Sequence, residues 1–201
     1  MKKSVSRDEI LDAALTLGSE QGWERLTLHH IARYLHISLA QIHREFPQKD
    51  DIVDAWLDRA DQAMLAQFPK HASDIHLSND HSPNTALTTT ERLQLAMQSW
   101  FDALAPYHKL TGEMLLYKLE PGHIHLQAAG ILRISRTVQW FREAAELKAS
   151  NLQRIGQEIA LSSLFIGMFV YWLNDKSPNQ LNTRARLQKA LLRGNRISLW
   201  T

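Results

Sequence analysis

The chain has 201 residues, of which 44% are hydrophobic and 22% charged, so a packed core is possible and disorder is not indicated. Its formal net charge is only +2, so any affinity for a polyanion must come from how charges are placed. Cysteine is absent, which excludes disulfides, thiolate metal sites and cysteine nucleophiles. The N-terminus lacks the apolar region of a signal peptide, and the most apolar run, residues 159–173, is too short to span a bilayer comfortably. We therefore expect a cytoplasmic protein without membrane insertion.

The N-terminal residues predict one amphipathic helix. Residues 8–21 place Ile10, Ala14 and Leu17 on an inward face. Gly22 follows, and glycine is the residue most often found just after a helix C-terminus. Trp23 and the residues after it are expected to plug the core beside this helix.

Residues 26–46 divide into two short helical periods around a tight turn. One face of the first period is apolar at spacings of three and four, with Leu28, Ile31, Ala32 and Leu35. The hydroxyl of Ser38 can accept a backbone N–H of the second helix, and Thr27 is the matching candidate for the first. Two short helices joined by such a turn predict a helix-turn-helix, whose second helix enters the DNA major groove.

The second helix of this pair would present polar and small side chains to DNA. Gln41 could bond adenine or a phosphate, and His43 could donate to a phosphate. Arg44 and Lys49 are expected to contact phosphates, whereas Leu39 and Ala40 could touch a thymine methyl group. For each of these residues the alternative is a solvated surface position.

Residues 7–54 resemble the DNA-binding domain of the TetR (tetracycline-repressor-like) family of bacterial regulators. The matching residues are Ile10-Leu11-Asp12-Ala13-Ala14, Gly22, Leu26-Thr27, Ile31-Ala32, Ile37-Ser38, Phe46 and Lys49. The resemblance implies an all-α protein of about nine helices. It also implies a helix-turn-helix DNA-binding domain over residues 1–50 and a helical ligand-binding and dimerisation domain over residues 51–201. The predicted DNA-binding residues are Thr27, where a helix N-terminus would meet a phosphate, and Ser38, Leu39, Ala40, Gln41, His43, Arg44 and Lys49.

The chain departs from the family's pattern at three positions. His36 stands in the turn where the family usually has glycine, and His43 stands where it usually has tyrosine. Histidine tolerates positive φ better than most non-glycine residues, so we expect the turn to form with some strain. The third departure is Glu45, an anion in a helix that would meet a polyanion.

The remaining residues predict longer helices and one long polar loop. The helices are expected over residues 50–68, 90–104, 106–120, 123–147, 151–174 and 181–192, with Thr90 as a cap and Gly194 as the last break. The loop covers residues 69–88 and is unusually long for a compact domain.

Large apolar side chains on these helices supply candidates for a ligand pocket, which the resemblance places in the helical body. The candidates are Trp100, Phe101, Met114, Tyr117 and Trp140, with Arg136 as a possible partner of a ligand carboxylate or phosphate. The ligand is expected to be small and apolar. The alternative is that these side chains form ordinary core.

Two C-terminal helices supply candidates for dimerisation, and the resemblance implies a four-helix bundle formed by two copies. Small residues at spacings of four, three and four would let a partner helix come close. The candidates are Gly156, Ile159, Ala160, Ser163, Gly167, Val170, Leu187 and Leu191. From Lys176 to the end there is no acidic residue, which suits the C-terminal end of a helix dipole. Contact with an anionic membrane is the alternative.

The sequence therefore predicts a DNA-binding transcriptional regulator, a ligand-responsive repressor that acts as a homodimer on a near-palindromic operator. Residues 172–178, with Thr183 and Leu187, are also similar to ubiquinone-biosynthesis accessory proteins, which share the fold but bind lipids or quinones instead of DNA. An enzyme is not expected, because no nucleophile–base spacing, paired carboxylates or phosphate loop is found. Neither a cofactor nor a metal site is expected.

Overall fold

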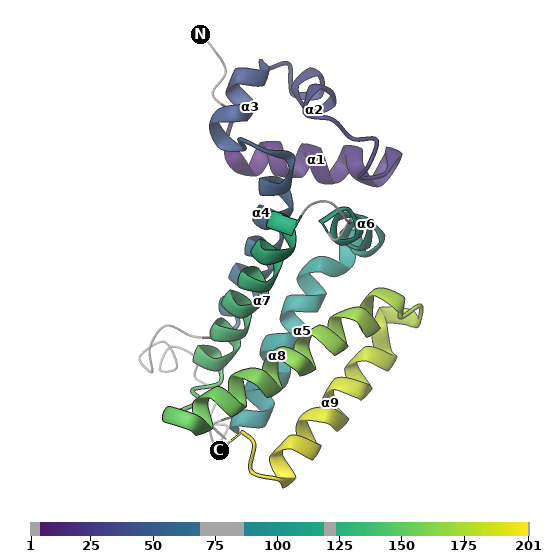
Figure 1. Ribbon diagram of the computed structural model, residues 1–201. Coiled ribbons are helices and arrows are strands. Elements are labelled where there is room, and N and C mark those ends of the chain that lie inside the picture. The colour runs from purple at the N-terminus through teal and green to yellow at the C-terminus, as the bar shows by residue number, and fades with distance from the viewer. Residues whose placement is uncertain (1–4, 69–86, 119–123, 201) are drawn as a thin grey trace, which may run out of the picture. The chain divides into compact units, whose positions relative to one another are not determined.

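The computed structural model describes residues 5–68, 87–118 and 124–200, and all regular elements in these residues are helical (Figure 1). The α-helices are α1 (Arg7–Gln21), α2 (Leu28–Leu35), α3 (Leu39–Glu45), α4 (Lys49–Leu65), α5 (Thr89–Leu104), α6 (His108–Lys118), α7 (Ile124–Ala144), α8 (Asn151–Asn174) and α9 (Leu181–Arg196). Short 3-10 helices, η2 (Ala105–Tyr107) and η3 (Pro178–Gln180), precede α6 and α9. The predicted all-α fold is confirmed. The predicted loop over residues 69–88 lies outside the described residues except for its last two.

The chain divides into two compact units. The first comprises Met1–Arg59 and Leu104–Arg133, and the second Ala60–Ala103 and Ile134–Thr201. The first unit therefore contains α1 to α3, most of α4, and α6. The second contains most of α5, together with α8 and α9. The sequence analysis expects a DNA-binding domain to end at residue 50. This boundary concerns function and not compactness, and it stays a prediction.

Each of the first three helices begins with a capping box, in which the cap and the third helical residue exchange hydrogen bonds. The caps are Ser6, Thr27 and Ser38, and their partners are Glu9, His30 and Gln41. This exchange satisfies N–H groups that a helix start leaves without a partner inside the helix. The predicted caps Thr27 and Ser38 are thus confirmed.

The inner faces of α1, α2 and α3 share one apolar core. Its fully buried members are Ile10, Ala14, Trp23, Leu26, Ile31, Ile42 and Phe46. The turn between α2 and α3 is closed by His36, which has φ 56° and ψ 42° in the left-handed region. The backbone N–H of His36 donates to the carbonyl groups of Ala32 and Arg33. The expectation of a positive φ at this position is confirmed.

α6 packs against α1 within the first unit. A Cβ atom on Gly18 of α1 would lie only 3.0 Å from Cδ1 of Leu110, so the glycine allows the close approach of the two helices. The carboxylate of Glu113 accepts a hydrogen bond from the backbone N–H of Trp23 at 2.9 Å. α6 is therefore attached to the segment that leads from α1 into α2.

An aromatic cluster forms the core of the second unit. The ring of Trp100 meets Phe165 edge-on with centroids 5.0 Å apart, and Phe101 stacks on Trp172 at 5.6 Å. The indole N–H of Trp100 also donates to Oδ1 of the buried Asp61 at 2.8 Å. These contacts join α5 to α8 and to the C-terminal turns of α4.

The connection between α8 and α9 is built around the buried carboxylate of Asp175. It accepts hydrogen bonds from the N–H and hydroxyl of Ser177 at 2.9 and 2.6 Å, and from those of Thr183 at 2.7 Å each. Burial alone would raise the pKa of this carboxyl, but the hydrogen bonds outweigh burial and hold its pKa well below the ordinary value. Asp175 therefore stabilises the start of α9.

Several predicted helix boundaries are wrong: α4 ends at Leu65 instead of Phe68, and α7 ends at Ala144 instead of Leu147. α5 begins one residue earlier than expected, because the side chain of Thr88 caps it by accepting from the N–H of Glu91 at 3.3 Å, and Thr90 lies inside the helix. α9 continues through Gly194 instead of ending there. A Cβ atom on Gly194 would lie 2.5 Å from Nε1 of Trp200, so the glycine makes room for the indole ring.

α8 has 24 residues and, by length and composition alone, is long and apolar enough to cross a membrane. The predicted apolar run over residues 159–173 is thus part of a longer helix. Core helices of soluble proteins can have the same length and hydropathy, so these two properties are weak evidence for a membrane span. One face of α8 is buried against the aromatic cluster, through Leu161, Phe165, Met168 and Trp172.

Candidate nucleic-acid interface

α3 buries one side and presents the other to solvent. Ile42 is fully buried, whereas Leu39, Ala40, His43 and Arg44 are exposed. The exposed set contains four of the residues predicted to meet DNA. α3 is short, and both of its ends are fixed, by the Ser38 cap and by the buried Phe46.

Gln41 has a structural role that the sequence analysis did not assign to it. Its side-chain oxygen accepts from the backbone N–H of Ser38 at 3.0 Å and lies 3.1 Å from the Ser38 hydroxyl. The side chain is half-exposed and completes the capping box of α3. A contact between Gln41 and a base, which stays a prediction, would have to form alongside these bonds or replace them.

Thr27 and His30 define the N-terminus of α2. The Thr27 hydroxyl accepts from the N–H of His30 at 3.3 Å, and Nδ1 of His30 lies 3.4 Å from the N–H of Thr27. Thr27 is exposed, so a phosphate could approach this helix end. For Nδ1 of His30 to accept the hydrogen bond from the N–H of Thr27, this ring nitrogen must carry no proton.

Lys49 is placed differently from a free surface cation. Its ammonium donates to the backbone carbonyl of Trp23 at 2.5 Å and lies over the rings of Trp23 and Tyr117, at 4.7 and 5.0 Å from their centroids. Burial lowers the pKa of Lys49, against the opposing effects of Asp50 and Glu24. Lys49 therefore links α4 to α6 and to the start of the helix-turn-helix. Its predicted phosphate contact would require the ammonium to leave these partners.

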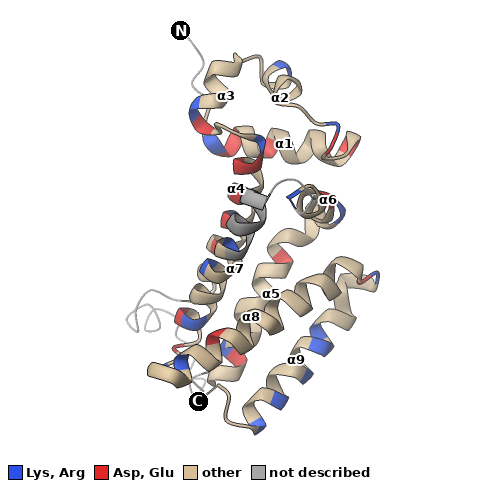
Figure 2. Ribbon diagram, viewed as in Figure 1, with Lys and Arg blue, Asp and Glu red and all other residues tan. Residues whose placement is uncertain are grey.

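α3 carries Arg44 and Glu45, and Lys49 at the start of α4 is followed by Asp50 and Asp51, whereas the charged residues of α9 are all basic (Figure 2). Two carboxylates of α1 are held by a cation: Arg59 pairs with Asp8 at 3.2 Å and with Asp12 at 2.5 Å. Arg7 donates to the backbone carbonyl of Glu45 and lies 4.2 Å from the ring centroid of Phe46. The ion pairs with Arg59 neutralise part of the negative charge of α1, and the contacts of Arg7 connect α1 to the end of α3.

The structure does not gather the predicted ligand-pocket residues around one described cavity. Trp100 and Phe101 are buried in the aromatic cluster of the second unit, and Met114 is buried in the first. Tyr117 lies beside Lys49 in the first unit. The two remaining candidates, Arg136 and Trp140, are exposed on α7. The reading of Trp100, Phe101 and Met114 as ordinary core fits this placement.

The predicted dimer residues fall into two groups. Those on α8 are wholly or partly exposed: Gly156, Ile159, Ala160, Ser163, Gly167 and Val170. Leu187 and Leu191 on α9 are instead buried within the chain. A partner could therefore reach the α8 residues without unfolding the chain, but not these two leucines.

Sequence reasoning missed two groups that the structure singles out. Leu110 packs α6 against α1, and Glu113 joins α6 to Trp23 after α1; no local pattern marks them, because their partners are about 90 positions away. Asp175 could have been found, since an Asp two residues before Ser177 is a common turn signal.

Comparison with known proteins gives one consistent result. A family model described as bacterial regulatory proteins, tetR family, matches residues 10–56. The crystal structure of a TetR transcriptional regulator from Nitrosomonas europaea ATCC 19718 is 36% identical, with a TM-score of 0.77, over 94% of this chain and 97% of that one. A TetR transcriptional regulator from Rhodococcus sp. RHA1 is similar in fold, at 18% identity and a TM-score of 0.64, over 93% of this chain and 94% of that one. No curated protein matches the chain.

Proposed function

Because this chain belongs to the TetR family of bacterial regulatory proteins, we propose that it is a homodimeric, ligand-responsive repressor that reads a near-palindromic operator with α3. DNA-binding regulation is the property of the family. The repressor role, the dimer and the response to a ligand are the proposal. We further propose that residues 1–50 carry the DNA-binding function and residues 51–201 the ligand-binding and dimerisation functions.

The observation that carries the proposal is the geometry of α2 and α3. Two capped helices meet at a turn closed by His36, and α3 exposes Leu39, Ala40, His43 and Arg44 together. Such a helix can lie in a major groove with its N-terminal residues on base edges. Arg44 and His43 would contact phosphates, and Leu39 and Ala40 would supply apolar contact to thymine. The exposed face of α3 thus combines groups that would bind the DNA backbone with groups that would contact the bases.

A seam of exposed apolar residues on α8 supports self-association. The seam consists of Leu152, Ile155, Ile159, Ile166 and Val170, which are between 44% and 84% exposed. They follow one another at helical spacing along about 27 Å of the helix. In a dimer with a two-fold axis, the seam of one copy would pack against the seam of the other, and both seams would be removed from water. Two α3 helices would then read half-sites about one helical turn apart.

A response to a ligand requires a link between the helical body and the DNA-binding helices. α6 offers one, because Leu110 packs on Gly18 and Glu113 holds the N–H of Trp23. A displacement of α6 would therefore act directly on the segment between α1 and α2. By linkage, a ligand that weakens operator binding is itself bound more weakly by the operator-bound protein, by the same factor.

Selection of bound sequences from a random duplex pool tests the proposal. We expect enrichment of a near-palindromic site bound by two copies of the chain, with an affinity that falls steeply as salt rises. Arg44→Gln should reduce the salt slope by about one for each phosphate that the arginine would have neutralised. Lys148→Gln removes the same charge from an exposed position outside the first unit and should leave the slope unchanged. If no sequence is enriched even at low salt, the proposed function is wrong.

A further inference from the structure

Two aromatic rings and a backbone carbonyl enclose the ammonium of Lys49. Its Nζ donates to the carbonyl of Trp23 at 2.5 Å and lies 4.7 and 5.0 Å from the ring centroids of Trp23 and Tyr117. Burial favours the neutral form of this amine, whereas the charges of Asp50 and Glu24 favour the cation. The faces of aromatic rings attract a cation. The three groups that hold the ammonium therefore carry no formal negative charge.

Lys49 adjoins the proposed DNA-binding face on two sides in the sequence. It begins α4 and lies three residues after Phe46, the buried residue that ends α3. Its partner Trp23 lies four residues before Thr27, which is exposed at the N-terminus of α2. A lysine has a flexible four-carbon stem, so its ammonium can turn from one partner to another while the backbone stays in place. To bind a phosphate, the ammonium must leave the two rings.

We propose that Tyr117 is an autoinhibitory residue, whose ring competes with an operator phosphate for the ammonium of Lys49. The proposal rests on the proposed function and specifies what limits the affinity for DNA. In the free protein the ammonium lies over the ring of Tyr117. In the complex it would bind a phosphate through a charge-assisted hydrogen bond. Tyr117 would not touch DNA, but the loss of its contact with the ammonium would lower the operator affinity.

The ring of Tyr117 can be removed with less damage to the helix-turn-helix than that of Trp23. Trp23 is fully buried in the core that α1, α2 and α3 share, and its backbone N–H and carbonyl bond Glu113 and Lys49. Tyr117 is only half-buried and belongs to α6. Tyr117→Leu removes the ring and keeps an apolar side chain, whereas Tyr117→Phe keeps the ring and removes only the hydroxyl.

The affinity of the full chain for its selected operator, followed by fluorescence anisotropy at low salt, measures the competition. One exposed contact between a cation and a ring changes an equilibrium constant about two- to fivefold, and a dimer breaks two of them. We therefore expect Tyr117→Leu to raise the operator affinity about five- to thirtyfold. Tyr117→Phe is the matched control and should bind like the wild type. Damage to the fold would lower the affinity, so misfolding does not explain a gain.

A double-mutant cycle tests whether Tyr117 acts through the ammonium. Lys49→Met removes the charge and should reduce the salt slope of operator binding by about two, one for each of the two copies. In the Lys49→Met background, Tyr117→Leu should no longer change the affinity, because the ring has no cation to hold. A merely structural role of Tyr117 would give the same change in both backgrounds. Lys176→Met, at an exposed position of the second unit, is the charge control and should leave the slope unchanged.

Several results would overturn the proposal: an unchanged or lower affinity of Tyr117→Leu, or an equal gain in Tyr117→Phe. An unchanged salt slope in Lys49→Met would show that the ammonium stays beside the rings in the complex, and would overturn it as well. A chain that binds its operator but gives any of these results refutes only the role of Tyr117. If no duplex is bound specifically even at low salt, the repressor and the competition for Lys49 are both refuted.

Discussion

Replacing Gln41 with glutamate separates the capping role of this side chain from its predicted role at DNA. The side-chain oxygen of Gln41 accepts from the N–H of Ser38 at 3.0 Å, and a glutamate can accept the same bond. A negative charge in the first turn of a helix also contributes about 0.3–1 kcal/mol through the helix dipole. We therefore expect Gln41→Glu to unfold at the same temperature as the wild type or slightly above it.

Operator binding should respond in the opposite direction. Two like charges 4 Å apart in water repel by about 1 kcal/mol. A two-fold dimer carries the substitution twice, so the affinity should fall by about 2 kcal/mol, or about thirtyfold, at low salt. The loss should shrink as salt rises, because ions screen charges exposed to solvent.

Thermal unfolding followed by circular dichroism and operator binding followed by fluorescence anisotropy measure the two effects. Gln41→Ala is the matched control, since it removes the capping bond without adding charge. It should unfold more easily and lose less affinity than Gln41→Glu at low salt. Unchanged operator affinity in Gln41→Glu would refute the placement of this residue at DNA, and a large loss of stability would refute its capping role.

Three further changes test other parts of the fold. Asp175→Asn should lower stability by about 1–3 kcal/mol at pH 7. Because the pKa of the folded carboxyl is depressed, its contribution is complete above about pH 5, begins to fall near the ordinary pKa of about 3.9 and is lost fully only below the depressed pKa of the folded state. The difference between wild type and variant in urea unfolding should therefore shrink progressively from about pH 5 toward about pH 2, and a constant difference would contradict this. Gly194→Ala should lower the unfolding temperature despite the better helix propensity of alanine, because its Cβ atom would lie 2.5 Å from Trp200; a rise would show that the indole does not pack there. Ile159→Glu, at a residue 63% exposed, should leave the folded chain intact but shift sedimentation from dimer to monomer, and a dimer that persists would exclude the seam.

The helix-turn-helix could be predicted from the sequence because its determinants are local. The caps Thr27 and Ser38 act on N–H groups within three residues, and His36 adopts the left-handed conformation that its place in the turn requires. Apolar spacing was also enough to place α8, which begins and ends where predicted, at Asn151 and Asn174.

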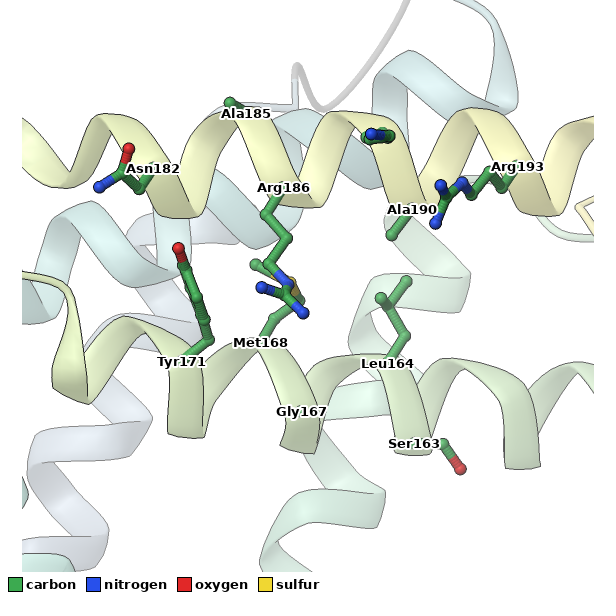
Figure 3. Close-up of a pocket in the computed structure, with 11 residues that line it drawn as sticks. Ser163, Leu164, Gly167, Met168, Tyr171, Asn182, Ala185, Arg186, Ala190 and Arg193 are labelled. Atoms are coloured by element: carbon green, nitrogen blue, oxygen red, sulfur yellow. The ribbon is translucent and has the colours of Figure 1, made fainter.

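Positions whose role depends on a distant neighbour could not be predicted in this way. Gly194 has the local signature of a helix end, but it lies inside α9, where the absence of a side chain makes room for the ring of Trp200. Leu187 was predicted to lie at the dimer interface, but it is buried within its own chain. Apolar spacing predicts that a residue is buried, but it does not show whether the covering residues belong to the same chain or to a partner. The basic residues of α9 were explained by the helix dipole, and only their placement beside Leu164 and Met168 reveals a groove between α8 and α9 (Figure 3).

The central claim is that two copies of this chain place two α3 helices on one operator. Its most direct test is the stoichiometry and hydroxyl-radical footprint of the selected site, measured at a salt concentration that suppresses non-specific binding. The account predicts two chains or a small multiple of two on a two-fold symmetric site, with half-site centres about 10 base pairs apart or a multiple of that distance. A single chain on an asymmetric site, or protection with no sequence preference, would contradict it.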